Sequence, residues 1–221
     1  MRAVIFDLWD TIVLWSADGH EDVHTRMAEH AGVEPRALLR AFDETHLERS
    51  VGPLLDNVRA VLAMLGVDEA HTDALADFRR DHARTILVPR EGALETLEEL
   101  RRRGFKRGLI SVCSGDVEDV WEETPFAPHF DDAVFSCAVG IRKPDPRIYR
   151  IACERLGVEP EDCLFVGDGA NDELAGAERV GMKAVCILRP DLDEPIWHEA
   201  RGWEPTIRSL PEVLDLVDRA A

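Results

Sequence analysis

The residues that could do chemistry follow short apolar segments, at the points where buried strands would end. Asp7 and Asp10 come directly after one such segment, Ser111 lies at the end of a second, and Lys143 follows a third. A fourth is followed by the acidic stretch Gly167-Asp168-Gly169-Ala170-Asn171-Asp172-Glu173. Ligands of parallel α/β sheets bind at the carboxyl ends of the strands, so these groups are predicted to meet at one edge. Carboxylates, a hydroxyl and a lysine would then converge there, and clustered carboxylates are costly unless a cation lies near them.

The elements that must position these residues alternate between strands and helices. The apolar segments typical of buried strands are Ala3–Phe6, Gly108–Val112, Ala133–Ser136, Leu164–Val166 and Ala184–Leu188. Helical patterns cover Gly92–Arg103, Pro146–Leu156 and Asp172–Val180, and a last amphipathic helix is expected over Pro211–Ala221. This alternation predicts an α/β fold, in which a Rossmann-like parallel sheet is covered by helices on both faces in three layers.

Residues 14–88 show helical spacing and no strand-like segment. The helical stretches are Ala28–His30, Ala37–Phe42, Leu54–Leu65 and Ala74–Phe78. Gly32 and Gly66 are expected to end helices, and Asp68 to cap the start of one. We therefore predict an all-helical cap domain at 14–88, inserted into a core domain formed by residues 1–13 and 89–221.

Taken in order, the motifs resemble those of the haloacid dehalogenase superfamily. They read VIFDLWDT, GLISVCS, GIRKPDPRIY and LFVGDGANDELAGA, and the helical insertion falls between the first and the second, where that superfamily places one type of cap. The resemblance runs from Met1 to about Arg189. It implies a hydrolase of small phosphate esters in which Asp7 attacks phosphorus and forms an aspartyl-phosphate.

The same resemblance implies a Mg²⁺ site. Asp7, the backbone carbonyl of Trp9, and Asp168 would hold the ion, with Asp172 or Glu173 in support, directly or through water. An ordinary turn or helix-capping role for the two later aspartates is the alternative, since Asp favours both positions.

Two further residues would act on the phosphoryl group. Ser111 Oγ would bind its oxygens, and Lys143 would place a positive charge beside them and keep Asp7 ionised. Lys143 is one of only three lysines in the chain, against 26 basic residues in total, which favours a functional role over a solvated surface position.

One departure from the phosphatase pattern weakens this interpretation. Phosphatases of the superfamily usually carry a second aspartate two residues after the nucleophile, as general acid and base, and here that position is Trp9. Asp10 is the nearest substitute, but successive side chains of an extended segment point in opposite directions. General acid–base assistance is worth roughly 10²–10⁴ in rate. Its loss predicts a slow phosphatase, or a regulatory protein that binds metal and phosphate.

The other alternative is a 2-haloacid dehalogenase that uses Asp7 without metal. Arg40 in the cap is its candidate halide acceptor, although a solvated helix arginine is the more common case. Members with that activity carry neutral polar residues where this chain has Asp168, Asp172 and Glu173, so the metal-dependent interpretation is preferred.

A motif from another class is rejected on geometry. His20-Glu21-Asp22-Val23-His24 matches the HExxH zinc-protease signature, and His30 follows at the spacing of a third ligand. The longer signature needs Gly where this chain has Met27. On a continuous helix His30 lies about 240° around the axis from His24, too far to share a metal. We expect a solvated cap helix there. Cys113, close to Ser111, is likewise expected to be structural, not a nucleophile.

Composition limits the partners. A net charge of −18 argues against electrostatic binding of nucleic acid or an anionic membrane. No apolar run approaches the roughly 18 residues of a membrane span, and the first residues do not resemble a secretory signal. The five cysteines include no CxxC pair, which favours a reducing, cytoplasmic compartment. The expected partner is a small phosphorylated molecule. No oligomeric state is predicted.

Overall fold

The core of the molecule is a six-stranded parallel sheet. The computed structural model describes residues 1–15 and 20–219, and the strand order is β3-β2-β1-β4-β5-β6. The strands are β1 (Ala3–Phe6), β2 (Lys106–Ser111), β3 (Asp132–Phe135), β4 (Cys163–Gly167), β5 (Lys183–Ile187) and β6 (Thr206–Ile207). β1 and β4 are therefore central neighbours, and the residues that follow them lie side by side. The expectation of an α/β fold with a parallel sheet is confirmed.

Alternate residues of the strands enter two separate cores. Val4 and Phe6 pack with helices α5 (Ala93–Arg102) and α10 (Glu212–Arg219) on one face. Ala3 and Ile5 pack with α8 (Pro146–Leu156) and α9 (Glu173–Arg179) on the other. Because both faces are buried, the strands are apolar throughout, as parallel strands covered by helices usually are. Two short helices, α6 (Gly115–Val120) and α7 (Ser136–Val139), follow β2 and β3.

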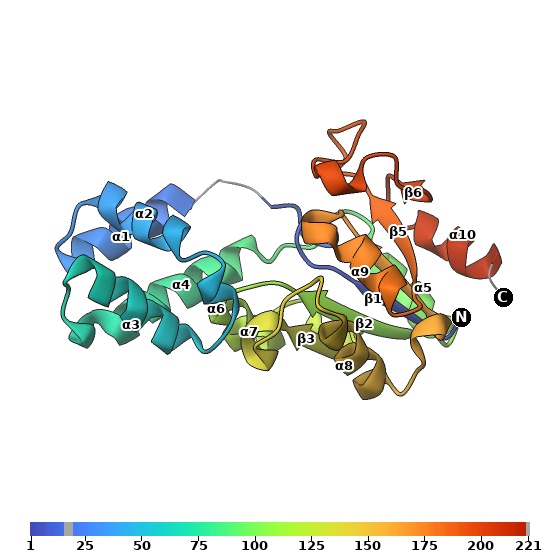
Figure 1. Cartoon of the computed structure of the whole chain (residues 1–221), viewed down its shortest axis with the longest axis horizontal. Coiled ribbons are helices and arrows are strands. Elements are labelled where there is room, and N and C mark those ends of the chain that lie inside the picture. Colours follow the sequence, from blue (N-terminus) through green and yellow to red (C-terminus); the bar gives the residue numbers. More distant parts are fainter. Residues whose placement is uncertain (16–19, 220–221) are drawn as a thin grey trace.

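A third core lies within the helices inserted after β1. They are α1 (His20–Ala31), α2 (Pro35–Glu44), α3 (Leu54–Leu65) and α4 (Thr72–Ile86), with a cluster of buried residues of their own. Gly66 ends α3 in the left-handed conformation, and Asp68 accepts a hydrogen bond from the Ala70 N–H as a cap. These helices extend from the side of the sheet toward which β1 runs (Figure 1). We keep 14–88 as the proposed extent of the cap.

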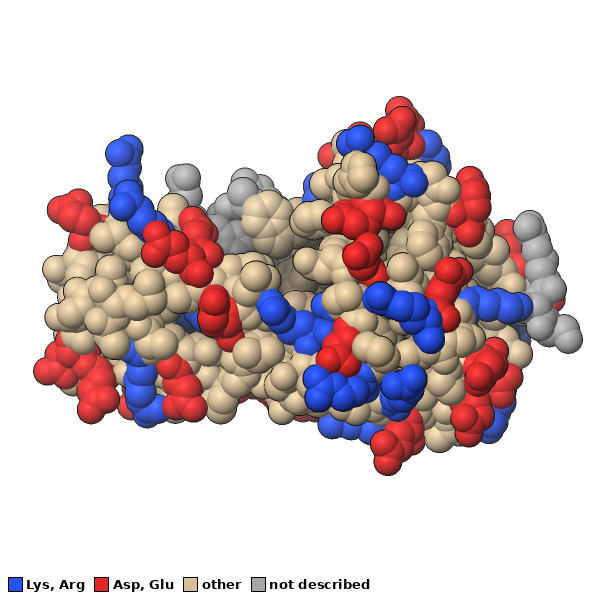
Figure 2. Space-filling view, viewed as in Figure 1, with Lys and Arg blue, Asp and Glu red and all other residues tan. Residues whose placement is uncertain are grey.

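The inserted helices are joined to the core at two places. α4 packs along α6, where the ion pair between Arg79 and Asp116 (2.9 Å) is buried. At the second place, the Gly52 N–H bonds the Cys137 carbonyl (2.9 Å) and Ser136 Oγ bonds the Ser50 carbonyl (2.6 Å). On the face shown in Figure 2, acidic and basic side chains are interspersed over both parts. No described helix is long and apolar enough to cross a membrane.

Candidate functional site

The site is built around Asp7, the first residue after β1. Its backbone N–H donates to the Val166 carbonyl of β4 (2.8 Å), which continues the strand pairing to the point where the side chain turns inward. The carboxylate is 5 % exposed. Its Oδ2 accepts the Thr11 hydroxyl at 3.3 Å, and its Oδ1 accepts Lys143 Nζ. Thr11 was not singled out from the sequence, although it stands one turn after the expected nucleophile.

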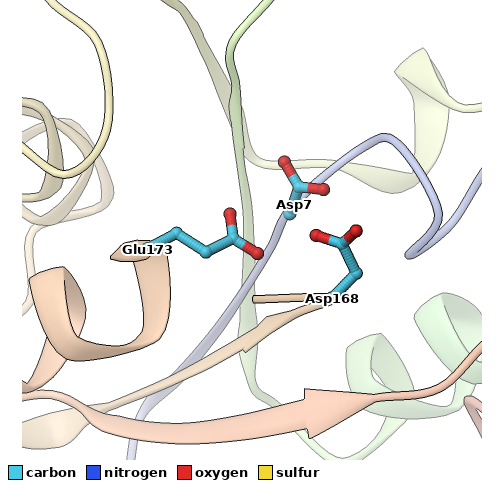
Figure 3. Close-up of side chains that lie close together, drawn as sticks. All are labelled: Asp7, Asp168 and Glu173. Carbon is cyan, nitrogen blue, oxygen red and sulfur yellow. The ribbon is translucent and has the colours of Figure 1, made fainter. Parts of the chain in front are cut away.

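Two more carboxylates face Asp7. Asp168 follows β4 and Glu173 is the first residue of α9, and each offers an oxygen within 4.8 Å of the others (Figure 3). Both are buried, at 6 % and 0 % exposure. In the described part of the chain, this is the one group of three or more residues that could hold a metal ion.

Crowding disfavours the charged forms of these acids. Burial and repulsion from Asp7 raise the pKa of Asp168 to about 6, against the effect of hydrogen bonds from the Ala170 N–H and the Trp197 indole. Burial also raises the pKa of Glu173 well above its usual value, with Asp7 and Asp168 adding to the shift and Lys143 opposing it. Among the described residues, the ion pairs of these three acids involve a single cation.

That cation is Lys143, which is 6 % exposed. Its Nζ bonds Asp7 Oδ1 and, at 2.5 Å, Glu173 Oε2. Burial alone would lower the pKa of Lys143, but the Asp7 and Glu173 carboxylates raise it above its ordinary value, so the ammonium stays charged. Glu173 is held from its other side by the Gly169 N–H (3.1 Å). Lys143 thus places its positive charge directly beside the Asp7 carboxylate.

Ser111 ends β2, the neighbour of β1 on the other side. It is fully buried, and its hydroxyl makes no hydrogen bond in the described part of the chain, although the Cys113 thiol lies beside it. A buried hydroxyl without a partner is costly, which suits a group that binds a ligand oxygen. Burial raises the pKa of Cys113, so this thiol stays protonated and unreactive.

The acidic loop is arranged differently from the sequence expectation. Asp172 is exposed and lies outside the carboxylate cluster, whereas Glu173 is inside it. The reason is the backbone: Asn171 and Asp172 both adopt the left-handed conformation, with φ of 54° and 57°. This kink delays the start of α9 and turns Glu173 inward. Of the two supporting ligands that the sequence left open, the structure brings Glu173 to Asp7.

Asp10 is not part of the carboxylate cluster. Its Oδ1 accepts Arg189 Nη1 at 2.7 Å and the Trp15 N–H at 3.1 Å. Trp9 is half-buried and packs against the core cluster that contains Phe6. The structure therefore gives Asp10 a partner other than Asp7. The Trp9 carbonyl as a metal ligand stays a prediction.

The remaining candidates lie on the cap helices. Arg40 is exposed on α2, as expected of a solvated arginine. α1 runs without a break from His20 to Ala31. It is the continuous helix on which His24 and His30 were expected to lie on different sides. The side chain of His20 lies outside the described residues. His24 is not solvated as expected: it is buried, with its ring 5.1 Å from that of Phe42.

Sequence comparison decides the family. The model of haloacid dehalogenase-like hydrolases matches residues 1–181, a region that contains the three clustered carboxylates, Ser111 and Lys143. The chain belongs to this family. The resemblance read from the four motifs is thus confirmed.

Relatives within the family differ in the reaction named for them. An (S)-2-haloacid dehalogenase 4A from Burkholderia cepacia is 30 % identical over 98 % of this chain and 95 % of its own. A glyceraldehyde 3-phosphate phosphatase from Methanopyrus kandleri is 39 % identical over 47 % of this chain and 45 % of its own. Among solved structures, a 2-haloacid dehalogenase from Pseudomonas syringae superposes with a TM-score of 0.73 at 25 % identity, covering 100 % of both chains. The chain is therefore a hydrolase of this family. Its relatives do not determine which bond it breaks, so the reaction is inferred below from the site.

Proposed function

We propose that this protein is a Mg²⁺-dependent phosphatase that hydrolyses a small phosphate ester through an aspartyl-phosphate at Asp7. The observation that carries the proposal is the charge of the site. Asp7, Asp168 and Glu173 would contribute three negative charges when ionised, and Lys143 contributes one positive charge. A divalent cation balances the remainder, and carboxylate oxygens are its preferred ligands. Without a cation, the buried Asp168 would repel the attacking Asp7 carboxylate.

Asp7 and Asp168 would hold the ion, with Glu173 supporting them directly or through water. When bound, Mg²⁺ supplies charge neutralisation for the phosphoryl group and its attacking carboxylate. Lys143 would add a second positive charge beside the Asp7 carboxylate, which its Nζ already contacts. The Ser111 hydroxyl, which has no hydrogen-bond acceptor or donor among the described residues, would bind a phosphoryl oxygen.

In the first step an Asp7 carboxylate oxygen attacks phosphorus, the ester P–O bond breaks, and the leaving alcohol takes its proton from water. In the second step water attacks the aspartyl-phosphate, phosphate leaves, and the Asp7 carboxylate is restored. With Trp9 in place of the usual acid and Asp10 bound to Arg189, we assign no carboxylate of the described residues to deliver the proton. We therefore expect slow turnover, fastest for esters whose leaving group needs no proton.

The second candidate is a 2-haloacid dehalogenase. It is favoured by Trp9, because displacement of a halide by Asp7 needs no proton donor, and by the full-length relative with that name. In that reaction Asp7 attacks the halogen-bearing carbon, halide leaves, and water hydrolyses the resulting ester. Asp168 argues against it, since a third buried acid beside Asp7 only opposes attack if no cation is bound.

A panel of phosphate esters and 2-haloacids, each assayed with Mg²⁺ and with EDTA, separates the candidates. We expect phosphate release from activated esters that EDTA abolishes, and no halide release. Asp168→Asn should lose this activity, whereas Asp172→Asn, one turn away on the exposed side, should keep it. Halide release in EDTA would overturn the proposal in favour of dehalogenation. Mg²⁺ binding without turnover of any ester would identify a regulatory protein.

A further inference from the structure

The segment that follows β5 presents a tryptophan to the candidate metal site. The Trp197 indole N–H donates a hydrogen bond of 2.5 Å to Asp168 Oδ2. The other oxygen, Oδ1, accepts the Ala170 backbone N–H at 3.1 Å. Trp197 is 39 % exposed, whereas Asp168 is 6 % exposed, so the bond connects a side chain at the surface to a buried carboxylate.

The turn that carries Trp197 is braced against the Asp168 loop. Ala200 is buried and packs onto Gly169, so closely that a Cβ added at Gly169 would lie 2.2 Å from the Ala200 Cβ. The Ala200 N–H in turn bonds the Trp197 carbonyl at 3.1 Å. Further along the segment, the Trp203 indole N–H donates to the Ala184 carbonyl of β5 at 3.4 Å. These contacts fix the backbone of the segment, and the backbone in turn positions the Trp197 indole beside Asp168.

A carboxylate in this position needs such support. Asp7 repels Asp168, and burial opposes its charge, so an unsupported side chain would rotate toward solvent. The Trp197 N–H occupies one lone pair of Oδ2 and fixes the rotation about the Cβ–Cγ bond. Lone pairs remain on both oxygens for a cation, and the carboxylate stays turned toward Asp7 and Glu173 as Figure 3 shows.

We infer that Trp197 is a positioning residue for the cation site, which it serves through Asp168; this inference rests on the proposed function. Hydrogen-bond partners of metal ligands typically change metal affinity by about 10–100-fold when removed. Trp197→Phe should therefore weaken Mg²⁺ binding by roughly tenfold or more. Trp203→Phe is the matched control, because it removes an indole N–H from the same segment that bonds a backbone carbonyl and not a carboxylate.

The test is calorimetric titration of the full-length protein with Mg²⁺ in the absence of substrate. We expect Trp203→Phe to bind like wild type and Trp197→Phe to bind more weakly, with unchanged thermal midpoints in EDTA. Excess Mg²⁺ should restore most of kcat in Trp197→Phe, which a merely structural defect would not allow.

The outcomes separate the inference from the function on which it rests. Equal Mg²⁺ affinity in wild type and Trp197→Phe, or equal weakening in both variants, would overturn the role of Trp197 alone. Absence of Mg²⁺ binding in wild type would overturn the proposed function as well.

Discussion

The conformation of a single residue, Asp10, decides which acid the site can use. Asp10 has a φ of 54°, a left-handed conformation that Asp and Asn tolerate better than most residues. Its carboxylate is thereby placed against Arg189, and Arg90 donates to its backbone carbonyl at 3.3 Å. The Asp10 carboxylate is thus occupied by the Arg189 guanidinium. Asp10 connects the loop after β1 to the segment after β5.

We predict different effects for substitutions at the neighbouring positions Trp9 and Asp10. Trp9→Asp restores the carboxylate where the family's phosphatases carry it, and should raise turnover of alkyl phosphates by about 10–100-fold, within the range of general acid–base catalysis. The gain should be much smaller for activated esters, whose leaving groups need no proton. Steady-state kinetics with one ester of each kind measures the difference. Some stability will be lost with the large side chain.

Asp10→Asn is the companion variant, since Asn accepts the same backbone conformation and removes only the charge. It should lower stability slightly and leave turnover of both esters nearly unchanged. Loss of activity in Asp10→Asn, with no gain in Trp9→Asp, would show that Asp10 is the acid after all.

Sequence reasoning reached the parts of the site that lie at strand ends. Asp7, Ser111 and Asp168 terminate or follow β1, β2 and β4, and the topology of a parallel sheet is enough to bring them to one edge. The choice between Asp172 and Glu173 depended on two left-handed residues, which no periodicity indicates. Trp197 stands 29 positions from Asp168 on an irregular segment, so no spacing rule connects them.

At the scale of elements, the bounds expected from the sequence match the observed ones most closely where the apolar pattern and the residues that start or stop an element agree. The expected ranges of β1, α3 and α8 coincide with the observed ones. Pro146 is the first residue of α8 and Gly157 directly follows its end. β6 was not predicted, because a strand of two residues, Thr206–Ile207, has no period to detect. α1 is longer than its apolar pattern suggested, because the first turns of this helix carry mostly polar residues.

The contact between α4 and α6 gives a prediction at this scale. Arg79 is bound to Asp116 at 2.9 Å, and Asp116 is 1 % exposed, so Arg79→Met would leave a buried carboxylate without its cation. Breaking such a buried pair costs about 3–5 kcal/mol. We expect the urea midpoint to fall accordingly.

The control for Arg79→Met lies on the same helix. Arg84 bonds Glu123 at 2.8 Å on the exposed side of the contact, where water solvates both partners. Arg84→Met should therefore change the midpoint far less. Equal losses in the two variants would mean that the burial of Arg79 contributes nothing beyond a surface ion pair. Recovery of part of the stability in Arg79→Met with Asp116→Asn would confirm the cause.

For the whole molecule, the acidic site adds to a chain that already carries a net charge of −18. Lowering the pH reduces that charge everywhere, so stability in EDTA alone cannot isolate the site. Mg²⁺ acts only where it binds, and the difference between Mg²⁺ and EDTA is therefore the informative quantity. This difference in stability reports on the site, because an ion that binds only the folded state raises the free energy of unfolding of the entire chain.

We predict that this difference depends on pH in a direction set by Asp168. The raised pKa of about 6 means that the metal-free folded state loses stability as pH rises from the unfolded value near 4 through 6. Above pH 7 the carboxylate is charged and Mg²⁺ relieves the repulsion; at pH 5 protons already do so and compete with the ion.

At one hundred times its Kd, Mg²⁺ should add about 2.7 kcal/mol to the free energy of unfolding at pH 7.5. For a chain of this size that corresponds to roughly 5–10 °C in thermal midpoint. Thermal melts with Mg²⁺ and with EDTA at pH 7.5 and pH 5 measure this shift in midpoint, and the shift should be much smaller at the lower pH.

In Asp168→Asn the midpoint in EDTA at pH 7.5 should rise, because the repelled charge is gone, and the Mg²⁺ shift should largely disappear. A Mg²⁺ shift that is equal at both pH values, or that survives in Asp168→Asn, would place the ion somewhere other than beside Asp7 and Asp168.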